Sequence, residues 1–134
     1  MKINVTDGSI SFELGTIRTT TNRSDFLQTP LGRAAKNDFA NEIWRHYKIE
    51  PEPGIAGSIH FKGERIDRVF LLMTIPSDES NEWTEQHEHD RKSRHDGWLR
   101  AELGEPPYKY EWGEIVSEFD DRACVSEIIM VYGE

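Results

Sequence analysis

The sequence predicts an α+β fold: a mainly antiparallel sheet of about seven strands in the order ββ-α-βββ-α-ββ, with one long helix packed on one face. Short apolar runs separated by turn residues indicate the strands. A single long segment with capping residues at both ends indicates the helix. Four Trp, six Phe and four Tyr supply large core side chains. A chain of 134 residues fits one domain, residues 1–134.

The first two strands are predicted to form a hairpin. Asp7-Gly8 lies between the apolar runs Ile3–Val5 and Ile10–Leu14. An Asp-Gly pair tolerates the positive φ angles of a tight hairpin turn. Residues 10, 12 and 14 are apolar and alternate with polar ones, so one face of the second strand is expected to be buried.

Two short helices are expected next. The polar cluster Thr19–Asn22 is typical of a helix start, and Phe26 and Leu27 follow at helical spacing. Thr29-Pro30 indicates a second start, with proline at the first helical position.

Three strands are predicted at residues 42–50, 55–62 and 65–75, and the sequence Pro51-Glu52-Pro53-Gly54 breaks the first from the second. The third run is apolar on both faces, which indicates a central strand.

The long helix is predicted at residues 81–103, with Thr84 as its N-cap and Gly104 as its C-cap. The second half of its stripe is more apolar than the first, so we expect the second half to pack on the sheet and the first half to project. Gly97 is interpreted as a point of close packing. The stripe consists of Trp83, His87, Arg91, His95, Trp98, Leu99 and Leu103. A closing hairpin is predicted from residues 108–119 and 125–132.

The formal net charge of −9 argues against nucleic-acid binding, which requires a basic surface. Between Gly104 and Glu134 the chain carries eight acidic and two basic residues. This asymmetry indicates either a surface that favours solubility or one that binds a basic partner.

Cysteine content and hydropathy predict a cytoplasmic protein. The one cysteine, Cys124, excludes an intramolecular disulfide and suits a reducing compartment. The N-terminus lacks the apolar region of a signal peptide, and the best apolar run, Val69–Met73, is far too short to span a membrane.

The histidines of the predicted long helix do not have metal-ligand spacing. His87 and His89 are two residues apart and point in different directions, and His87 and His95 are separated by two helical turns. We therefore expect no metal site and no cofactor, and interpret the segment as a solvated helix with an incidental run of histidines.

Other candidate chemistry is weaker. Cys124 near Arg122 is either a thiol of lowered pKa or a small core residue. Glu114 and Glu118 share one face of a predicted strand, and glycosidases use paired carboxylates, but the pattern indicates no pocket for a sugar, so we favour a partner surface or a plain polar face. The aromatic cluster Tyr108, Tyr110, Trp112 and Trp98 is interpreted as core, with ligand stacking as the alternative.

Residues 95–99 read HDGWL and residues 103–115 read LGEPPYKYEWGEI, followed by Ser117, Asp120, Arg122 and Ser126. This C-terminal third resembles a group of small, mostly uncharacterised bacterial proteins with an HDxWL…LGxPPYxYxWGxI signature, from which the chain departs at Ala123-Cys124. By overall type the chain is also similar to immunity proteins of toxin systems, which implies a carboxylate-rich face that blocks a basic toxin.

The function expected from these observations is protein binding without catalysis, with an acidic surface occluding the site of a basic protein. The alternative is a small-molecule-binding domain or minor enzyme that uses the Trp/Tyr cluster and the His-rich helix. The candidate contact residues are Glu111, Glu114, Glu118, Asp120 and Asp121.

Overall fold

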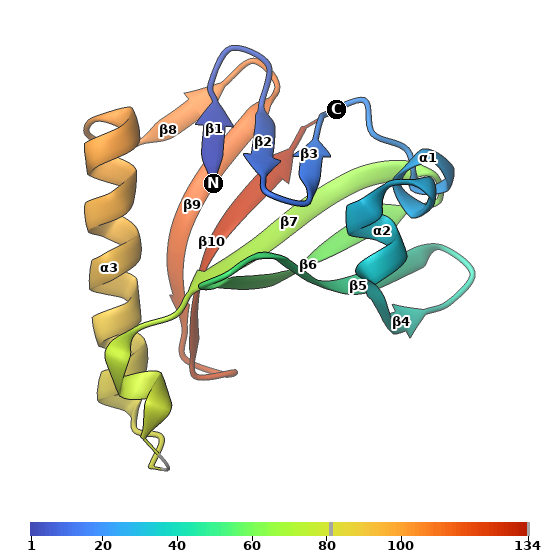
Figure 1. The fold of residues 1–134 in the computed structure, drawn as a ribbon. Coiled ribbons are helices and arrows are strands. Elements are labelled where there is room, and N and C mark those ends of the chain that lie inside the picture. Colours follow the sequence, from blue (N-terminus) through green and yellow to red (C-terminus); the bar gives the residue numbers. More distant parts are fainter. Residues whose placement is uncertain (81, 134) are drawn as a thin grey trace.

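The computed structural model describes residues 1–80 and 82–133 as an α+β fold with two antiparallel sheets (Figure 1). The small sheet has the order β1-β2-β3, and the main sheet has seven strands in the order β4-β5-β6-β7-β10-β9-β8. The α+β class and a seven-stranded antiparallel sheet with one long helix are therefore confirmed. The elements are β1 (Lys2–Asn4), β2 (Ser9–Phe12), β3 (Gly15–Ile17), α1 (Arg23–Gln28), α2 (Pro30–Ala34), β4 (Lys36–Ala40), β5 (Trp44–Glu52), β6 (Ile55–Lys62), β7 (Arg65–Met73), the 3₁₀ turn η1 (Pro76–Glu79), α3 (Glu85–Leu103), β8 (Tyr108–Tyr110), β9 (Gly113–Asp120) and β10 (Val125–Tyr132).

The predicted strand order places the N-terminal hairpin in the main sheet. This prediction is wrong, because β1 and β2 form the small sheet with β3. Aromatic side chains hold it there. The Trp112 indole donates to the Val5 carbonyl at 2.8 Å, and the Tyr132 hydroxyl donates to the Gly8 carbonyl at 3.0 Å. Gly8 has φ +74°, and a Cβ on it would come within 2.5 Å of the Trp112 ring. The glycine therefore allows both the turn and the contact with the indole.

Strand β4, at the edge of the main sheet, was not predicted from the sequence. Residues 36–40 are exposed throughout, so β4 has no buried alternation to mark it. The chain reverses before β5 because the Asn41 side chain accepts hydrogen bonds from the backbone N–H groups of Ile43 and Trp44, at 2.8 and 2.7 Å. The β4–β5 pairing then follows from the turn.

The predicted strand 108–119 is divided into β8 and β9 by a tight turn at Glu111-Trp112. Gly113 follows the turn with φ +148°, and a Cβ at this position would lie 1.9 Å from the Val131 carbonyl oxygen. Only glycine lets β9 pair with β10 directly after the reversal.

The two short helices are confirmed, and side chains cap both. The side-chain oxygen of Asn22 accepts from the Asp25 backbone N–H at 2.7 Å, and the Thr29 hydroxyl accepts from the Gly32 N–H at 3.0 Å. Such caps satisfy N–H groups that have no partner within the first turn.

No helix in residues 1–80 and 82–133 has both the length and the apolar character needed to cross a membrane.

One face of the main sheet carries the core. Figure 1 shows α3 beside β9 and β10, and α1 and α2 close to the β4–β5 side. The core joins these elements to the small sheet, because Ile10, Phe26, Leu71, Leu99 and Ile128 belong to one buried cluster. We call the face that carries this core the inner face and the opposite one the outer face.

The long helix begins at Glu85, with Thr84 as the N-cap, and ends before Gly104. The predicted first position, Asn81, lies outside the described residues. The first half does not project, contrary to the sequence-based expectation, because Glu88 and Arg91 are buried on the inner face. Gly97 is exposed, and a Cβ there would meet nothing within 4 Å, so its interpretation as a close-packing point is also wrong.

Polar side chains attach α3 to the sheet. Four residues of the helix are buried, and three of them are polar: Glu88, Arg91 and His95, with Leu99 as the fourth. The Met73 backbone at the end of β7 donates to His95 Nε2 at 3.0 Å, and its carbonyl accepts from Arg91 at 2.6 Å. The Ser126 backbone N–H of β10 donates to the Glu88 carboxylate at 2.9 Å. We call this set, with Asp78, the α3 network.

Arg91 is the central cation of the α3 network. It donates to the carboxylates of Asp78 at 2.8 Å and Glu88 at 3.1 Å. The hydrogen bond from Arg91 holds the pKa of Asp78 below its usual range. Burial opposes ionisation of Glu88, but hydrogen bonds from Arg91 and Ser126 outweigh it and lower its pKa as well. Both carboxylates are therefore anionic partners of a buried guanidinium.

Truncation of Leu99 should destabilise the protein more than truncation of Trp98, because Leu99 lies on the core side of α3 and Trp98 at its margin. Leu99 is 0 % exposed, so Leu99→Ala should lower the free energy of unfolding by about 2–5 kcal/mol. Trp98 is only partly buried against the core, so Trp98→Ala should cost less than half of that. Urea unfolding of both variants checks this, and a larger loss for Trp98→Ala would show that α3 is rotated relative to the described packing.

Stability should fall in mildly acidic solution. Burial, helped by the charge of Arg91, lowers the pKa of His95 from 6.5 to about 4. The unfolded chain then takes up a proton that the folded chain refuses. The contribution of neutral His95 is complete above pH 6.5 and is lost as the pH falls toward 4, by about 1.4 kcal/mol per pH unit.

The variant His95→Gln tests this assignment, because its amide can still accept from the Met73 N–H without titrating. Unfolding free energies measured from pH 7 to pH 4.5 should fall more steeply for the wild type than for His95→Gln. Burial also lowers the pKa of His60 to about 4, so some slope should remain in the variant. Equal slopes would contradict the role given to His95.

Candidate functional site

The five predicted contact residues do not form one surface. Glu111 lies in the β8–β9 turn, Glu114 lies at the start of β9, and Glu118 and Asp120 lie at its far end, followed by Asp121 in the next turn. At about 3.3 Å per residue, Glu114 and Asp120 are some 20 Å apart along the strand. Glu114 also stands opposite a base, Lys109, in the β8–β9 pairing.

The far end of the β9–β10 hairpin does gather carboxylates. Glu118 is directly opposite Glu127 in the strand register, and Asp120 is two residues further along the same face of β9. We call Glu118, Asp120 and Glu127 the acidic trio. Within the part of the chain that the structure describes, none of the three forms an ion pair with a Lys or Arg side chain. Like charges placed opposite each other on a sheet repel.

The pKa of Glu127 is raised above its usual range. Burial raises it first, and the negative charges of Asp120, Glu118 and Glu88 raise it further. Glu127 was missed by reasoning from sequence because it stands within an apolar strand, seven residues beyond Asp120 and across a turn. The strand pairing, not the spacing in the chain, brings it beside Glu118.

The outer face next to the acidic trio is apolar. Strand register places Val116, Ile129 and Phe70 in a row across β9, β10 and β7. Ile129 is buried by its neighbours, whereas Val116 and Phe70 are half-buried. No helix or strand of the described residues packs on this side, since the helices and the small sheet belong to the inner face.

Aromatic rings continue the outer face toward β4. His46 and His60 stack with ring centroids 3.5 Å apart and an interplanar angle of 5°. Phe39 follows on one side at 5.1 Å and Phe70 on the other at 4.7 Å. The outer face thus changes from acidic at the end of β9 to aromatic at β4. We call the rings of Phe39, His46, His60 and Phe70 the aromatic ladder. A period-two pattern in the sequence, with His46 two residues after Trp44 and His60 two residues after Ser58, could have located it.

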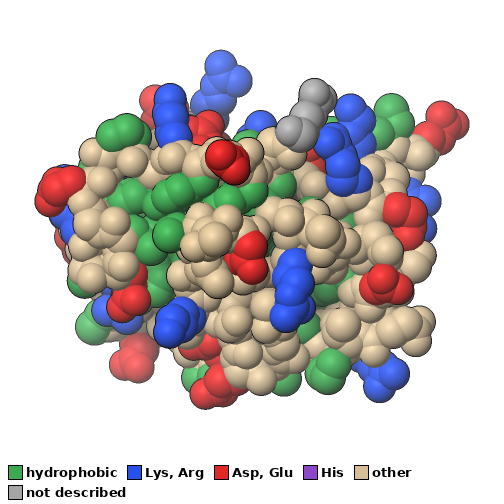
Figure 2. Space-filling model, turned by 90° about the horizontal axis from the view of Figure 1, so that it is seen from above, with side chains coloured by type: hydrophobic (Ala, Val, Ile, Leu, Met, Phe, Trp, Pro, Cys, Tyr) green, Lys and Arg blue, Asp and Glu red, His purple; other side chains and the backbone are tan. Residues whose placement is uncertain are grey.

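The surface seen from above the view of Figure 1 has no such charge arrangement. Figure 2 looks down on the molecule from above the view of Figure 1 and shows hydrophobic side chains gathered in a band. Acidic and basic side chains are scattered around this band, so the described side chains in this view form no continuous acidic surface.

The histidines of α3 point to three different environments. His87 accepts from the Thr84 N–H at 3.2 Å as part of the helix cap, His89 packs on the Phe119 ring at 4.5 Å, and His95 is buried against Met73. No group of three or more potential metal ligands stands together among the described residues. Absence of a metal from the protein itself remains a prediction.

The four residues of the predicted aromatic cluster do not lie together: Tyr110 and Trp112 pack on each other, while Tyr108 and Trp98 line two different pockets. Tyr110 stacks on Trp112 at 5.2 Å, and Trp112 lies 5.6 Å from Tyr132 under the small sheet. These rings are packing partners, as expected. Cys124 has φ +51° at the end of the turn that leads into β10, and its thiol lies 3.6 Å from the Asp121 carbonyl oxygen.

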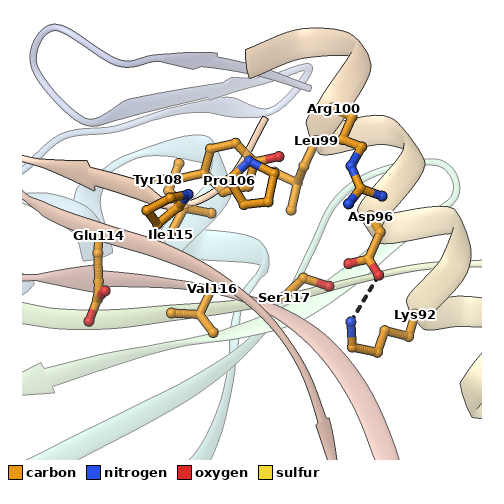
Figure 3. A pocket seen from close by; sticks show the side chains of 11 residues that line it. Lys92, Asp96, Leu99, Arg100, Pro106, Tyr108, Glu114, Ile115, Val116 and Ser117 are labelled. Carbon is orange, nitrogen blue, oxygen red and sulfur yellow. Dashed lines mark hydrogen bonds and ion pairs between the residues drawn. The ribbon is translucent and has the colours of Figure 1, made fainter. Parts of the chain in front are cut away.

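A pocket of about 330 Å³ lies between the second half of α3 and the β8–β9 hairpin (Figure 3). Its apolar wall comprises Leu99, Pro106, Pro107, Tyr108 and Ile115. Its polar side comprises Lys92, Asp96, Arg100 and Ser117, and the Lys92 ammonium lies 2.8 Å from the Asp96 carboxylate. We call it the α3–β8 pocket. In Figure 3, Glu114 and Val116 point away from the helix, toward the outer face.

Two cations, Lys92 and Arg100, and two carboxylates, Asp96 and Glu114, line the α3–β8 pocket. Burial opposes ionisation of Asp96, but the hydrogen bond and charge of Lys92, the nearby Ser117 and the charge of Arg100 lower its pKa below the usual range. The Ser117 hydroxyl is buried and forms no well-directed hydrogen bond within the described residues. Sequence reasoning did not find this pocket, because residues 108–119 were predicted to be one continuous strand, in which Tyr108 and Ile115 would not be paired as they are in the β8–β9 hairpin.

The chain matches no protein-family model, and neither curated proteins nor solved structures include a chain that it matches.

Proposed function

We propose that the protein is a protein-binding domain that engages a basic partner with the acidic trio and the adjoining apolar row of the outer face. The observation that carries the proposal is the strand register, which places Glu118 opposite Glu127 and on the same face as Asp120, with no Lys or Arg ion pair to any of the three among the described residues. A cationic group placed on the trio would relieve the repulsion among the three carboxylates.

The neighbouring surface supports the same proposal. Protein interfaces combine an apolar centre with a charged rim that fixes orientation and speeds association. Val116, Ile129 and Phe70 supply the apolar centre, and the acidic trio supplies one rim. In the immunity-protein interpretation the partner is a basic toxin whose site this surface occludes. Asp121 extends the rim into the turn, whereas Glu111 lies at the other end of β9 and belongs to a different surface.

The alternative, a small-molecule site built from the Trp/Tyr cluster and the His-rich helix, has less support. The Tyr110 and Trp112 rings pack on each other, and the three α3 histidines point to separate environments. The other two rings of the cluster, Tyr108 and Trp98, line two different pockets beside α3, so the cluster does not converge on one site.

Charge reversal tests the proposal. The triple variant Glu118→Lys, Asp120→Lys, Asp121→Lys should lose the partner, because like charges across an interface cost several kcal/mol. Its unfolding free energy should fall by no more than about 1–2 kcal/mol, because exposed charges contribute little and the change removes the hydrogen bonds that the Asp120 carboxylate accepts from the Arg122 and Ala123 N–H groups. Partner capture from the source cell, followed by measured binding at two salt concentrations, checks both. Binding should weaken with salt, since screening acts beyond about 8 Å at physiological ionic strength.

The matched control reverses the same number of exposed charges elsewhere: Glu79→Lys, Glu82→Lys, Glu85→Lys. Glu88 is unsuitable for this control because it is buried in the α3 network. The control should retain the partner. Retention by the β9 variant together with loss by the control would assign binding to the start of α3 and contradict the proposal.

A further inference from the structure

We propose that the α3–β8 pocket binds a small organic anion with an apolar body. The pocket lies on the inner side of β9, so the proposal does not depend on the partner surface of the outer face. A volume of about 330 Å³ is at the small end of ligand pockets and suits a single ring with a short side chain.

The apolar wall selects the body of the ligand. Leu99, Ile115 and Tyr108 are 0 %, 3 % and 7 % exposed, so their side chains are held in place by the core. Pro106 and Pro107 face them across the opening and cannot change their backbone φ angles. A preformed apolar wall of this kind favours a rigid or cyclic hydrocarbon group, because little side-chain entropy is lost on binding.

Lys92, Arg100 and Asp96 are the charged groups on the helix side of the pocket and select the head group, whereas the fourth charged lining residue, Glu114, points away from the helix. Asp96 is occupied by Lys92 at 2.8 Å, so it has little capacity left for a cationic ligand. In Figure 3 the Arg100 guanidinium is directed into the space above Asp96. Its other contact, with Glu105 at 3.4 Å, joins two exposed side chains. A surface pair of this kind is weak, so a ligand carboxylate could replace it with a bidentate contact.

The Ser117 hydroxyl offers the remaining polar contact. It faces Asp96 from β9 and is buried without a well-directed partner in the described chain. Its hydrogen bond to Asp96 lowers the pKa of that carboxyl but is poorly directed, so part of the cost of burying the hydroxyl remains and a ligand oxygen would remove it. Cations on one side, a hydroxyl on the sheet and an apolar wall opposite them together define a carboxylate with a cyclic body as the ligand class.

Three probes with one body and different head groups test this assignment: 3-phenylpropionate, 3-phenylpropan-1-ol and 3-phenylpropylamine. Each is titrated into the full chain while the backbone amide NMR signals of Ile115, Ser117 and Arg100 are followed. The carboxylate should bind about 10-fold more tightly than the alcohol, since charge-assisted hydrogen bonds are about twice as strong as neutral ones, and the amine should bind least.

The variant Arg100→Gln should remove the preference for carboxylate over alcohol and leave binding of the alcohol within about two-fold, because the apolar wall is unchanged. Arg94→Gln removes the same charge from the same helix at an exposed position outside the pocket and should leave all three affinities unchanged. Equal affinities for the three probes, an equal loss in both variants, or no shift of the pocket amides at about 10 mM probe would overturn the proposal.

Discussion

The buried contact of Arg91 with Asp78, Glu88 and the Met73 carbonyl is the interaction on which the rest of the structure depends. The long helix has no continuous apolar stripe, and Leu99 is its only fully buried apolar side chain among the described residues. Hydrophobic burial alone therefore offers little to orient it. The α3 network supplies directional contacts instead, to the end of β7 through Met73 and to β10 through Ser126.

The position of α3 determines what the sheet exposes. With α3 fixed over β9 and β10, its second half and the β8–β9 hairpin enclose the α3–β8 pocket. The small sheet and the short helices join the same core, which leaves the outer face to the acidic trio, the apolar row and the aromatic ladder. Side chains that alternate along β9 therefore serve two sites: Ser117 lines the pocket on one side of the sheet, while Glu118 belongs to the trio on the other.

Sequence patterns predicted those parts of the fold that rest on local chemistry. Asp7-Gly8, Asn22 and Thr29-Pro30 each satisfy backbone groups within a few residues, so their turns and helix starts were found. The β8–β9 turn was missed because Gly113 is required by a contact with Val131, which is distant in sequence. Glu88 was missed because a buried carboxylate is explained only by Arg91 and by Ser126 from another strand. The candidate site shows the same limit, since Glu127 joins Glu118 through strand register alone.

A comparison of Arg91→Met with Lys92→Met tests most directly whether polar contacts hold α3 in place. Both changes remove one cation from the same helix and leave a side chain of similar length. Arg91→Met should lower the free energy of unfolding by about 3–5 kcal/mol, because Glu88 would remain buried without its cation. Lys92→Met should change it by less than about 1 kcal/mol, because Lys92 and Asp96 are partly exposed. Losses below about 1 kcal/mol for both variants would contradict a structural role for the α3 network.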